Sequence, residues 1–160
     1  MLEKKSDFII HPITVLQDNI VWVWVHNCNA VVVDPSISGP VEEWLLEKKL
    51  SLKAILQTHH HDDHIGGTQK LINTWPEAKV VASKKELKRI PFQTFSVGDN
   101  DIFNLMDGEI KVIEVHGHTN NHLAFYISKE NAKCNILFPG DTIFGGGCGR
   151  LLEGSPVQMF

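Results

Sequence analysis

The sequence predicts an α/β protein in which helices cover the faces of β-sheets. In the first half of the chain, short segments rich in β-branched and aromatic residues alternate with segments of helical spacing, and strands dominate the second half. A length of 160 residues and a hydrophobic content of 42% are ordinary for one globular domain. We therefore expect residues 1–160 to belong to a single domain.

Turn signals and prolines mark the ends of the predicted elements. Gln17-Asp18-Asn19 separates the first two strands, Asp34-Pro35 stops the third, and Pro40 takes the first position of a helix. We expect strands at Phe8–Val15, Ile20–His26, Ala30–Val33, Leu52–Gln57, Lys79–Ala82, Thr94–Val97, Ile102–Leu105, Ile110–Val115, Leu123–Ile127 and Asn135–Phe138. We expect helices at Val41–Leu50, Ile65–Trp75 and Lys84–Lys88.

Charge, hydropathy and cysteine usage argue against several classes of protein. The net charge is -4 and no basic stripe is present, so we expect no nucleic-acid partner. The most apolar stretch, Ile20–Val33, is too short and too interrupted to span a membrane. The charged segment Met1–Asp7 lacks the apolar stretch of a secretory signal, and three irregularly spaced cysteines do not form a disulfide framework. We expect a cytoplasmic monomer.

A cluster of histidines and aspartates follows the predicted strand that ends at Gln57. It reads THHHDDHIGG over residues 58–67, and imidazole nitrogen and carboxylate oxygen are ligands that suit zinc in a hydrolytic site. His59 and His61 point the same way if the segment is extended, and Asp63 and His64 follow within one turn. The cluster can therefore supply one metal ion from the first pair and a neighbouring ion from the second. The alternative is a solvated His- and Asp-rich loop.

Two later segments place further candidate ligands just after predicted strands. His118 lies in the segment VHGHT, and Asp141 lies in PGDT. Functional groups of α/β proteins gather at such strand ends. His118 would complete the ligand set of the first metal. Asp141 would place one oxygen on each metal or bridge both with a single oxygen. Alone, His118 fits a ligand and a buried polar residue equally well, and Asp141 is more typical of a turn. Their appearance together with the first cluster favours metal binding.

Five neighbouring polar residues are open to other interpretations. His60 and Asp62 alternate with the candidate ligands, so we expect them to face away from the metals. His116 and His122 are interpreted as structural or supporting residues. Asp34 either accepts a hydrogen bond from a ligand histidine or simply ends its strand.

These motifs together resemble those of glyoxalase II, the hydroxyacylglutathione hydrolases of the metallo-β-lactamase superfamily. The matching segments are residues 58–67, the Gly117–Thr119 segment GHT, and GDTIFGGGCGRLLEG over residues 140–154. The first two are common to the superfamily, and the third is specific to glyoxalase II. The resemblance implies a four-layer αβ/βα sandwich with two metals at the edge of the sheets. It also implies that a further strand and a helical substrate domain lie outside these residues, so that the fold is truncated at its C-terminal side.

The resemblance assigns roles to individual residues. It places the first zinc on His59, His61 and His118, the second on Asp63 and His64, and Asp141 between them. It implies that Arg150 contacts glutathione, although a surface cation is an equal alternative. Iron or manganese is an alternative to zinc, because related sites hold all three.

The activity implied by the resemblance is thioester hydrolysis. The expected substrate is S-D-lactoylglutathione, and the expected products are glutathione and D-lactate. A metal-bound hydroxide would attack the thioester carbonyl, and Asp63 and Asp141 would hold the metals and orient that hydroxide. Two alternatives stay open: an iron-dependent oxidoreductase similar to persulfide dioxygenases, and a metal-binding fragment without activity. The pair of Asp63 and His64 favours hydrolysis over the first.

Overall fold

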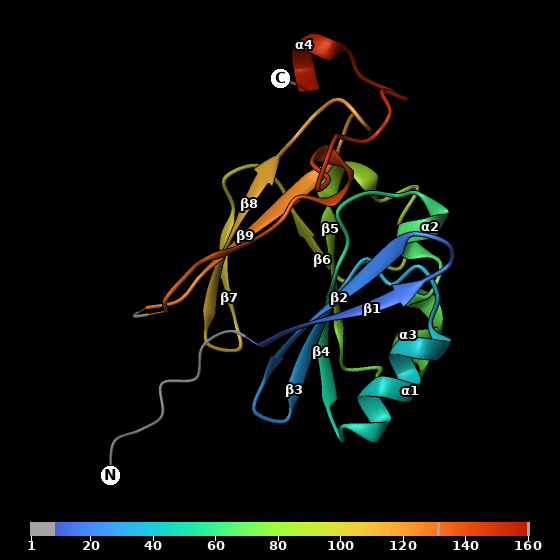
Figure 1. Ribbon diagram of the computed structural model, residues 1–160, viewed down its shortest axis with the longest axis vertical. Helices are drawn as coiled ribbons and strands as arrows, with labels where there is room; N and C mark the ends of the chain where they lie inside the picture. Colours follow the sequence, from blue (N-terminus) through green and yellow to red (C-terminus); the bar gives the residue numbers. More distant parts are fainter. Residues whose placement is uncertain (1–8, 131, 160) are drawn as a thin grey trace.

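The computed structural model describes residues 9–130 and 132–159, and it contains two β-sheets that pack face to face (Figure 1). The first sheet has six strands in sequential order, and the second has four in the order β10-β9-β8-β7. The first sheet consists of β1 (Ile9–Val15), β2 (Asn19–His26), β3 (Asn29–Val33), β4 (Ser51–Leu56), β5 (Lys79–Ser83) and β6 (Phe95–Val97). The second consists of β7 (Ile102–Leu105), β8 (Gly108–Glu114), β9 (Leu123–Ser128) and β10 (Ile136–Phe138).

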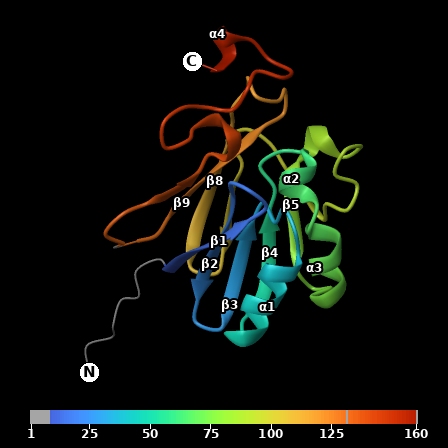
Figure 2. The same ribbon diagram turned by 45° about the vertical axis from the view of Figure 1, so that its right-hand side comes forward.

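Helices cover one face of the first sheet. Its strands β1 to β3 pair antiparallel, and β3 to β6 pair parallel. Parallel neighbours need crossover connections, and α1 (Gly39–Glu47) and α3 (Thr68–Thr74) supply two of them. Both helices lie on the same side of the sheet (Figures 1 and 2). Val41, Leu45 and Leu71 of these helices pack against the buried face of the sheet.

A second core lies between the two sheets. Val31, Val33 and Leu56 of the first sheet belong to the same buried cluster as Val112 and Phe125 of the second. The inner strands of the first sheet are apolar on both faces, because Ala30 and Val32 point toward the helices. This arrangement confirms the predicted α/β class.

The described residues form three of the four expected layers: helices, first sheet and second sheet. The outer face of the second sheet carries the exposed residues Glu109 and Lys111 on β8. In Figure 1, no helix of residues 9–130 or 132–159 lies over that face, and α4 (Pro156–Met159) lies beyond one end of the sandwich. None of the helices in this part of the chain has the length and apolar character needed to cross a membrane.

The helix expected at Ile65–Trp75 is wrong in its boundaries. A short helix α2 (Asp62–Ile65) comes first, and α3 starts only at Thr68, so the helical segment is interrupted at Gly66-Gly67. The backbone of Pro35–Ser38 passes directly over Gly67, whose amide donates to the Pro35 carbonyl oxygen at 2.7 Å. This approach of a distant segment explains the interruption.

One smaller expectation is wrong, and another concerns residues outside the described part of the chain. The helix expected at Lys84–Lys88 is a single 3-10 turn, η1 (Lys84–Glu86). Phe8, the expected first strand residue, and the segment Met1–Asp7 lie outside the described residues.

Replacing Gly67 by alanine is expected to destabilise the fold. The added Cβ would lie 2.6 Å from the carbonyl carbon of Ile37 and from the amide nitrogen of Ser38, so the backbone has to shift. Overpacking of this kind costs about 1–3 kcal/mol. Gly39→Ala is the matched control, because its Cβ meets nothing within 4 Å. Urea titration should show a lowered free energy of unfolding for Gly67→Ala alone. Equal stability of both variants would contradict this account.

Candidate metal centre

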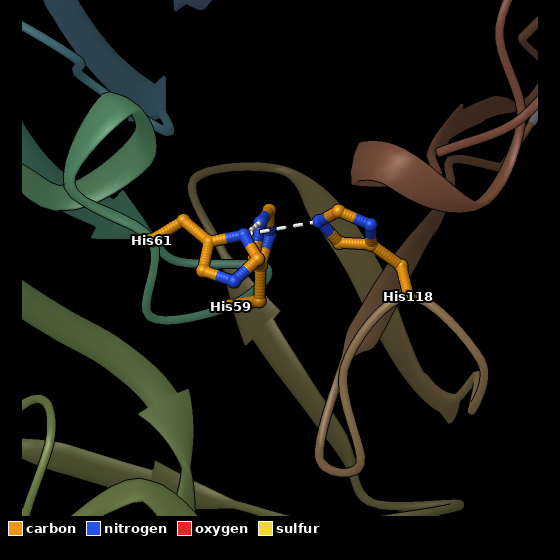
Figure 3. Close-up of side chains that lie close together, drawn as sticks. All are labelled: His59, His61 and His118. Carbon is orange, nitrogen blue, oxygen red and sulfur yellow. Dashed lines mark hydrogen bonds between the residues drawn. The ribbon is translucent and has the colours of Figure 1, made fainter. Parts of the chain in front are cut away.

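The candidate site forms where three loops meet at one end of the sandwich. The loop after β4 carries His59 and His61, and the connection between β8 and β9 carries His118. The turn η2 (Gly140–Thr142) follows β10 and carries Asp141. The side chains of His59, His61 and His118 point toward one another from two loops (Figure 3). The fold therefore brings together residues that are far apart in the sequence.

The first group consists of the three imidazoles of His59, His61 and His118. The Nε2 atoms of His59 and His118 each lie 3.0 Å from Nδ1 of His61. Nitrogens bound to one tetrahedral zinc at about 2.0–2.1 Å lie roughly 3.3 Å apart. The spacing of the three nitrogens is thus close to that of a zinc site.

The outer nitrogens of two of these rings are held by hydrogen-bond acceptors. His118 Nδ1 donates to the backbone carbonyl oxygen of Arg150 at 2.7 Å. The Thr58 hydroxyl donates to Asp34 Oδ2 at 2.6 Å, so it can accept from His59 Nδ1, which lies 2.9 Å away. In the neutral rings, the lone pairs of both Nε2 atoms therefore face His61. A proton on His61 Nδ1 cannot satisfy both, whereas a cation can.

Burial keeps two imidazoles of this group, those of His59 and His61, in the metal-binding form. Burial lowers the pKa of His59 strongly, and the neighbouring imidazoles lower it further. Burial also lowers the pKa of His61, with His118 acting in the same direction. Both rings are therefore neutral near pH 7, and neutral imidazole is the form that binds metals.

The second group consists of Asp63, His64 and Asp141. His64 Nε2 lies 3.2 Å from Asp141 Oδ1 and 3.6 Å from Asp63 Oδ2. The other carboxylate oxygen of Asp141 lies 3.4 Å from His118 Nε2. Asp141 thus turns one oxygen toward each group, which is the first of the two arrangements expected from the sequence.

The second group stabilises positive charge. Burial disfavours the charged form of His64, but hydrogen bonds to Asp141 and Asp34 outweigh it and raise the pKa to about 10. Burial likewise opposes ionisation of Asp141, yet its hydrogen bond with His64 holds the pKa of Asp141 below its usual range. A proton on His64 thus takes the place that a cation would occupy between the carboxylates. A metal that binds here has to displace that proton.

Asp34 forms hydrogen bonds that support both groups. This residue directly follows β3 and has a left-handed backbone, with φ of 50°, which aspartate tolerates better than most residues. Its Oδ1 accepts the Thr58 amide at 2.8 Å, and its Oδ2 accepts from His64 Nδ1 at 3.1 Å. Asp34 also lies close enough to His59 and His64 to form a ligand group with them. Because both of its oxygens already accept hydrogen bonds, the geometry favours a supporting role.

The remaining predicted residues lie around these groups. Asp62 is exposed at the start of α2, and His60 is directed toward Arg89, 3.0 Å away. His116 Nδ1 lies 2.6 Å from the carbonyl oxygen of Asn120. His122 is fully buried, stacks on His59, and accepts the Asp141 amide on Nε2 at 3.1 Å. Burial lowers the pKa of His122 to about 3.

Two contacts were not predicted from the sequence. Asn19 Nδ2 donates to Asp63 Oδ2 at 3.1 Å and to the Asp63 carbonyl oxygen at 3.2 Å. The Arg150 carbonyl oxygen orients His118, while the Arg150 side chain is exposed. Asn19 had a turn signal only, and nothing in the sequence indicated its partner, which is 44 residues away.

A cavity of about 710 Å³ opens beside the second group. Asp63, His64 and Asp141 line its polar part. Trp22 of β2 and Phe144 of the loop after η2 contribute to its apolar part. The cavity gives a ligand a route to the side of the candidate site that carries Asp141.

The family model named metallo-beta-lactamase superfamily matches residues 13–159. The chain therefore belongs to the metallo-beta-lactamase superfamily. Within it, the chain is 92% identical over its whole length to a hydroxyacylglutathione hydrolase of Prochlorococcus marinus strain NATL2A, and it covers 64% of that protein. It is 49% identical to a hydroxyacylglutathione hydrolase of Synechococcus sp. strain CC9605, with 94% of this chain and 61% of that protein covered. The chain thus spans less than two thirds of the length of these relatives.

Solved structures agree on the fold. The BLEG-1 B3 metallo-beta-lactamase superimposes with a TM-score of 0.80 at 22% identity, covering 94% of this chain and 81% of that chain. ETHE1 from Myxococcus xanthus gives a TM-score of 0.78 at 21% identity, covering 94% of this chain and 66% of that chain. At these identities the likeness establishes the fold alone.

Asp34→Asn is expected to weaken zinc binding by about 10–100-fold, the usual effect of removing a partner that orients a metal ligand. Asparagine tolerates the left-handed backbone, but it has one acceptor oxygen in place of two. It therefore cannot accept from the Thr58 amide and from His64 at the two separate positions that Asp34 Oδ1 and Oδ2 occupy. Competition with a chromophoric chelator measures the affinity. Asp62→Asn makes the same chemical change at the exposed start of α2 and should bind zinc as the native chain does. Equal affinity for both variants would refute the supporting role of Asp34.

Proposed function

We propose that this chain is the metal-binding domain of a glyoxalase II-type enzyme that hydrolyses S-(2-hydroxyacyl)glutathione thioesters such as S-D-lactoylglutathione. The observation that carries the proposal is the pair of adjacent ligand groups that share Asp141. The identity of 92% to a protein named hydroxyacylglutathione hydrolase supports the choice of reaction. The cavity beside the second group supports access of a substrate.

The ligand assignment follows from the two groups. His59, His61 and His118 would hold one zinc, Asp63 and His64 would hold a second, and Asp141 would contribute one oxygen to each. Zinc ions bound there supply a Lewis acid and lower the pKa of water. A thiolate is a good leaving group because thiol pKa values lie near 8.5, so the reaction needs no strong general acid.

The residues of the chain position these groups and the substrate. Asp34 and Asn19 orient His64 and Asp63 through the hydrogen bonds described above. Arg150 carries an exposed guanidinium on the segment that orients His118, so it is available to a carboxylate of glutathione. The glutathione-binding helical domain would lie outside residues 1–160. The three cysteines are exposed and free, which fits a cytoplasmic protein, and we expect it to act as a monomer because both groups come from one chain.

The direct test combines metal analysis with turnover. The 160-residue chain is compared with a chain extended by the remaining part of the Prochlorococcus marinus NATL2A relative. We expect two zinc ions per extended chain and release of glutathione from S-D-lactoylglutathione. Turnover by the extended chain alone would assign the activity to the complete protein and leave residues 1–160 as its metal-binding part. One iron per chain with consumption of oxygen would contradict the proposal and favour an oxidoreductase.

Asp141→Asn in the extended chain should lower zinc content and kcat together, each by at least about tenfold, because an amide is a poorer zinc ligand than a carboxylate. Glu43→Gln makes the same chemical change on the exposed side of α1 and should leave both quantities unchanged. Zinc content is measured by atomic emission, and kcat by release of free thiol. Full zinc occupancy and native kcat in Asp141→Asn would exclude the sharing of Asp141 by two metals.

A further inference from the structure

A network of charged side chains lies behind the first imidazole group and is not part of the ligand set. Arg89 follows η1 and pairs with both carboxylate oxygens of Glu86, through Nε and Nη2. Its third nitrogen, Nη1, donates to Glu153 Oε1 and to His60 Nε2. We call Glu86, Arg89 and Glu153 the Arg89 network. Together with His60, it joins three segments that are distant in the sequence.

The anchor of the network is a buried charge. Glu86 is only 1% exposed, and a carboxylate buried to this extent needs a charged partner. Arg89 supplies it with the two-pronged geometry that a guanidinium offers to a carboxylate. Asn121 Nδ2 adds a hydrogen bond to Glu86 Oε1 at 2.8 Å. Arg89 is therefore fixed in place from the side of η1.

The network reaches the loop that carries His59 and His61 through His60. A guanidinium can only donate hydrogen bonds, so His60 Nε2 is the acceptor and the proton of a neutral ring lies on Nδ1. That atom is buried and lies 3.8 Å from Glu86 Oε2. His60 is thus held by the hydrogen bond from Arg89, and its ring lies beside Glu86. Its backbone connects the two ligand histidines directly, so its position constrains theirs.

The network reaches the loop of His118 through Glu153. Glu153 Oε1 accepts from Arg89, and Oε2 accepts the backbone amide of Asn120 at 2.8 Å. Asn120 lies two residues after His118. Arg89 therefore connects the two loops whose imidazoles face each other in Figure 3.

We infer that Arg89 is a positioning residue for the first metal site: its guanidinium holds His60 and Glu153 so that the three ligand nitrogens keep their spacing. The inference rests on the proposed function, because it assumes that these nitrogens bind a metal. His60 and Glu153 do not point toward the three ligand nitrogens. The inference nevertheless gives both residues a role in metal affinity. Arg89 itself touches neither the ligand nitrogens nor the cavity lining.

The test measures metal affinity and metal geometry in four forms of the 160-residue chain. Arg89→Met removes the charge and the hydrogen bonds but keeps an unbranched side chain. Arg89→Lys keeps the charge but not the planar set of guanidinium donors. Lys88→Met removes a neighbouring exposed cation and is the matched control. Zinc affinity is measured by chelator competition, and the ligand geometry by the visible absorption of the cobalt(II)-substituted protein.

We expect Arg89→Met to weaken zinc binding at the first site by about 10–100-fold and to change the cobalt spectrum. The zinc affinity of Arg89→Lys should lie between those of Arg89→Met and the native chain, because one ammonium group cannot replace the several N–H donors of a guanidinium. Lys88→Met should match the native chain in both measurements. Melting temperatures of the metal-free variants separate a loss of metal affinity from a general loss of stability.

Glu153→Gln keeps the inference falsifiable if Arg89→Met does not fold. Glu153 is exposed, and glutamine can still accept the Asn120 amide, so only the pairing with Arg89 is weakened. We expect a severalfold loss of zinc affinity with an unchanged melting temperature of the metal-free chain. Native affinity and a native cobalt spectrum in both Glu153→Gln and the foldable Arg89 variants would overturn the inference while the proposed function stands. A native chain that binds no zinc would overturn both.

Discussion

The constraint on which the rest of this structure depends is the convergence of imidazole nitrogens from two separate loops on one point. His59, His61 and His118 cannot satisfy one another with the protons that neutral rings carry. Holding such rings at 3.0 Å therefore requires support from the surrounding fold. Several neighbours supply that support. Asp34 accepts from the Thr58 hydroxyl, which in turn contacts His59. The Arg150 carbonyl oxygen accepts from His118, and the buried ring of His122 stacks on His59.

The sandwich supplies these supports because its sheets end at the same edge. The apolar cluster between the sheets fixes β4, β8 and β10 relative to one another, so the loops that follow them are fixed as well. Asp34 illustrates how packing and chemistry are joined. The same residue directly follows a buried strand, adopts a left-handed backbone, and holds Thr58 and His64.

The sequence predicted the parts of the site that depend on local spacing. The alternation of His59 and His61 in an extended loop, with His60 directed away, needs no knowledge of the rest of the chain. Contacts between segments that are distant in the sequence could not be predicted from local spacing. Asn19 meets Asp63 across 44 residues, and Arg89 meets Glu153 across 64 residues. The interruption of the helix at Gly66-Gly67 was missed for the same reason, since the backbone of Pro35–Ser38 causes it. Sequence patterns thus predicted candidate ligands that the fold brings close together, while the residues that hold them became visible only in the folded chain.

The most direct test of the central claim is the location of bound zinc by anomalous X-ray diffraction from crystals grown with zinc. The account predicts one peak within about 2.0–2.1 Å of the facing nitrogens of His59, His61 and His118. It predicts a second peak in contact with Asp63 and His64, with Asp141 between the two. A single peak held by Asp34, His59 and His64, or zinc found only elsewhere on the protein, would contradict it.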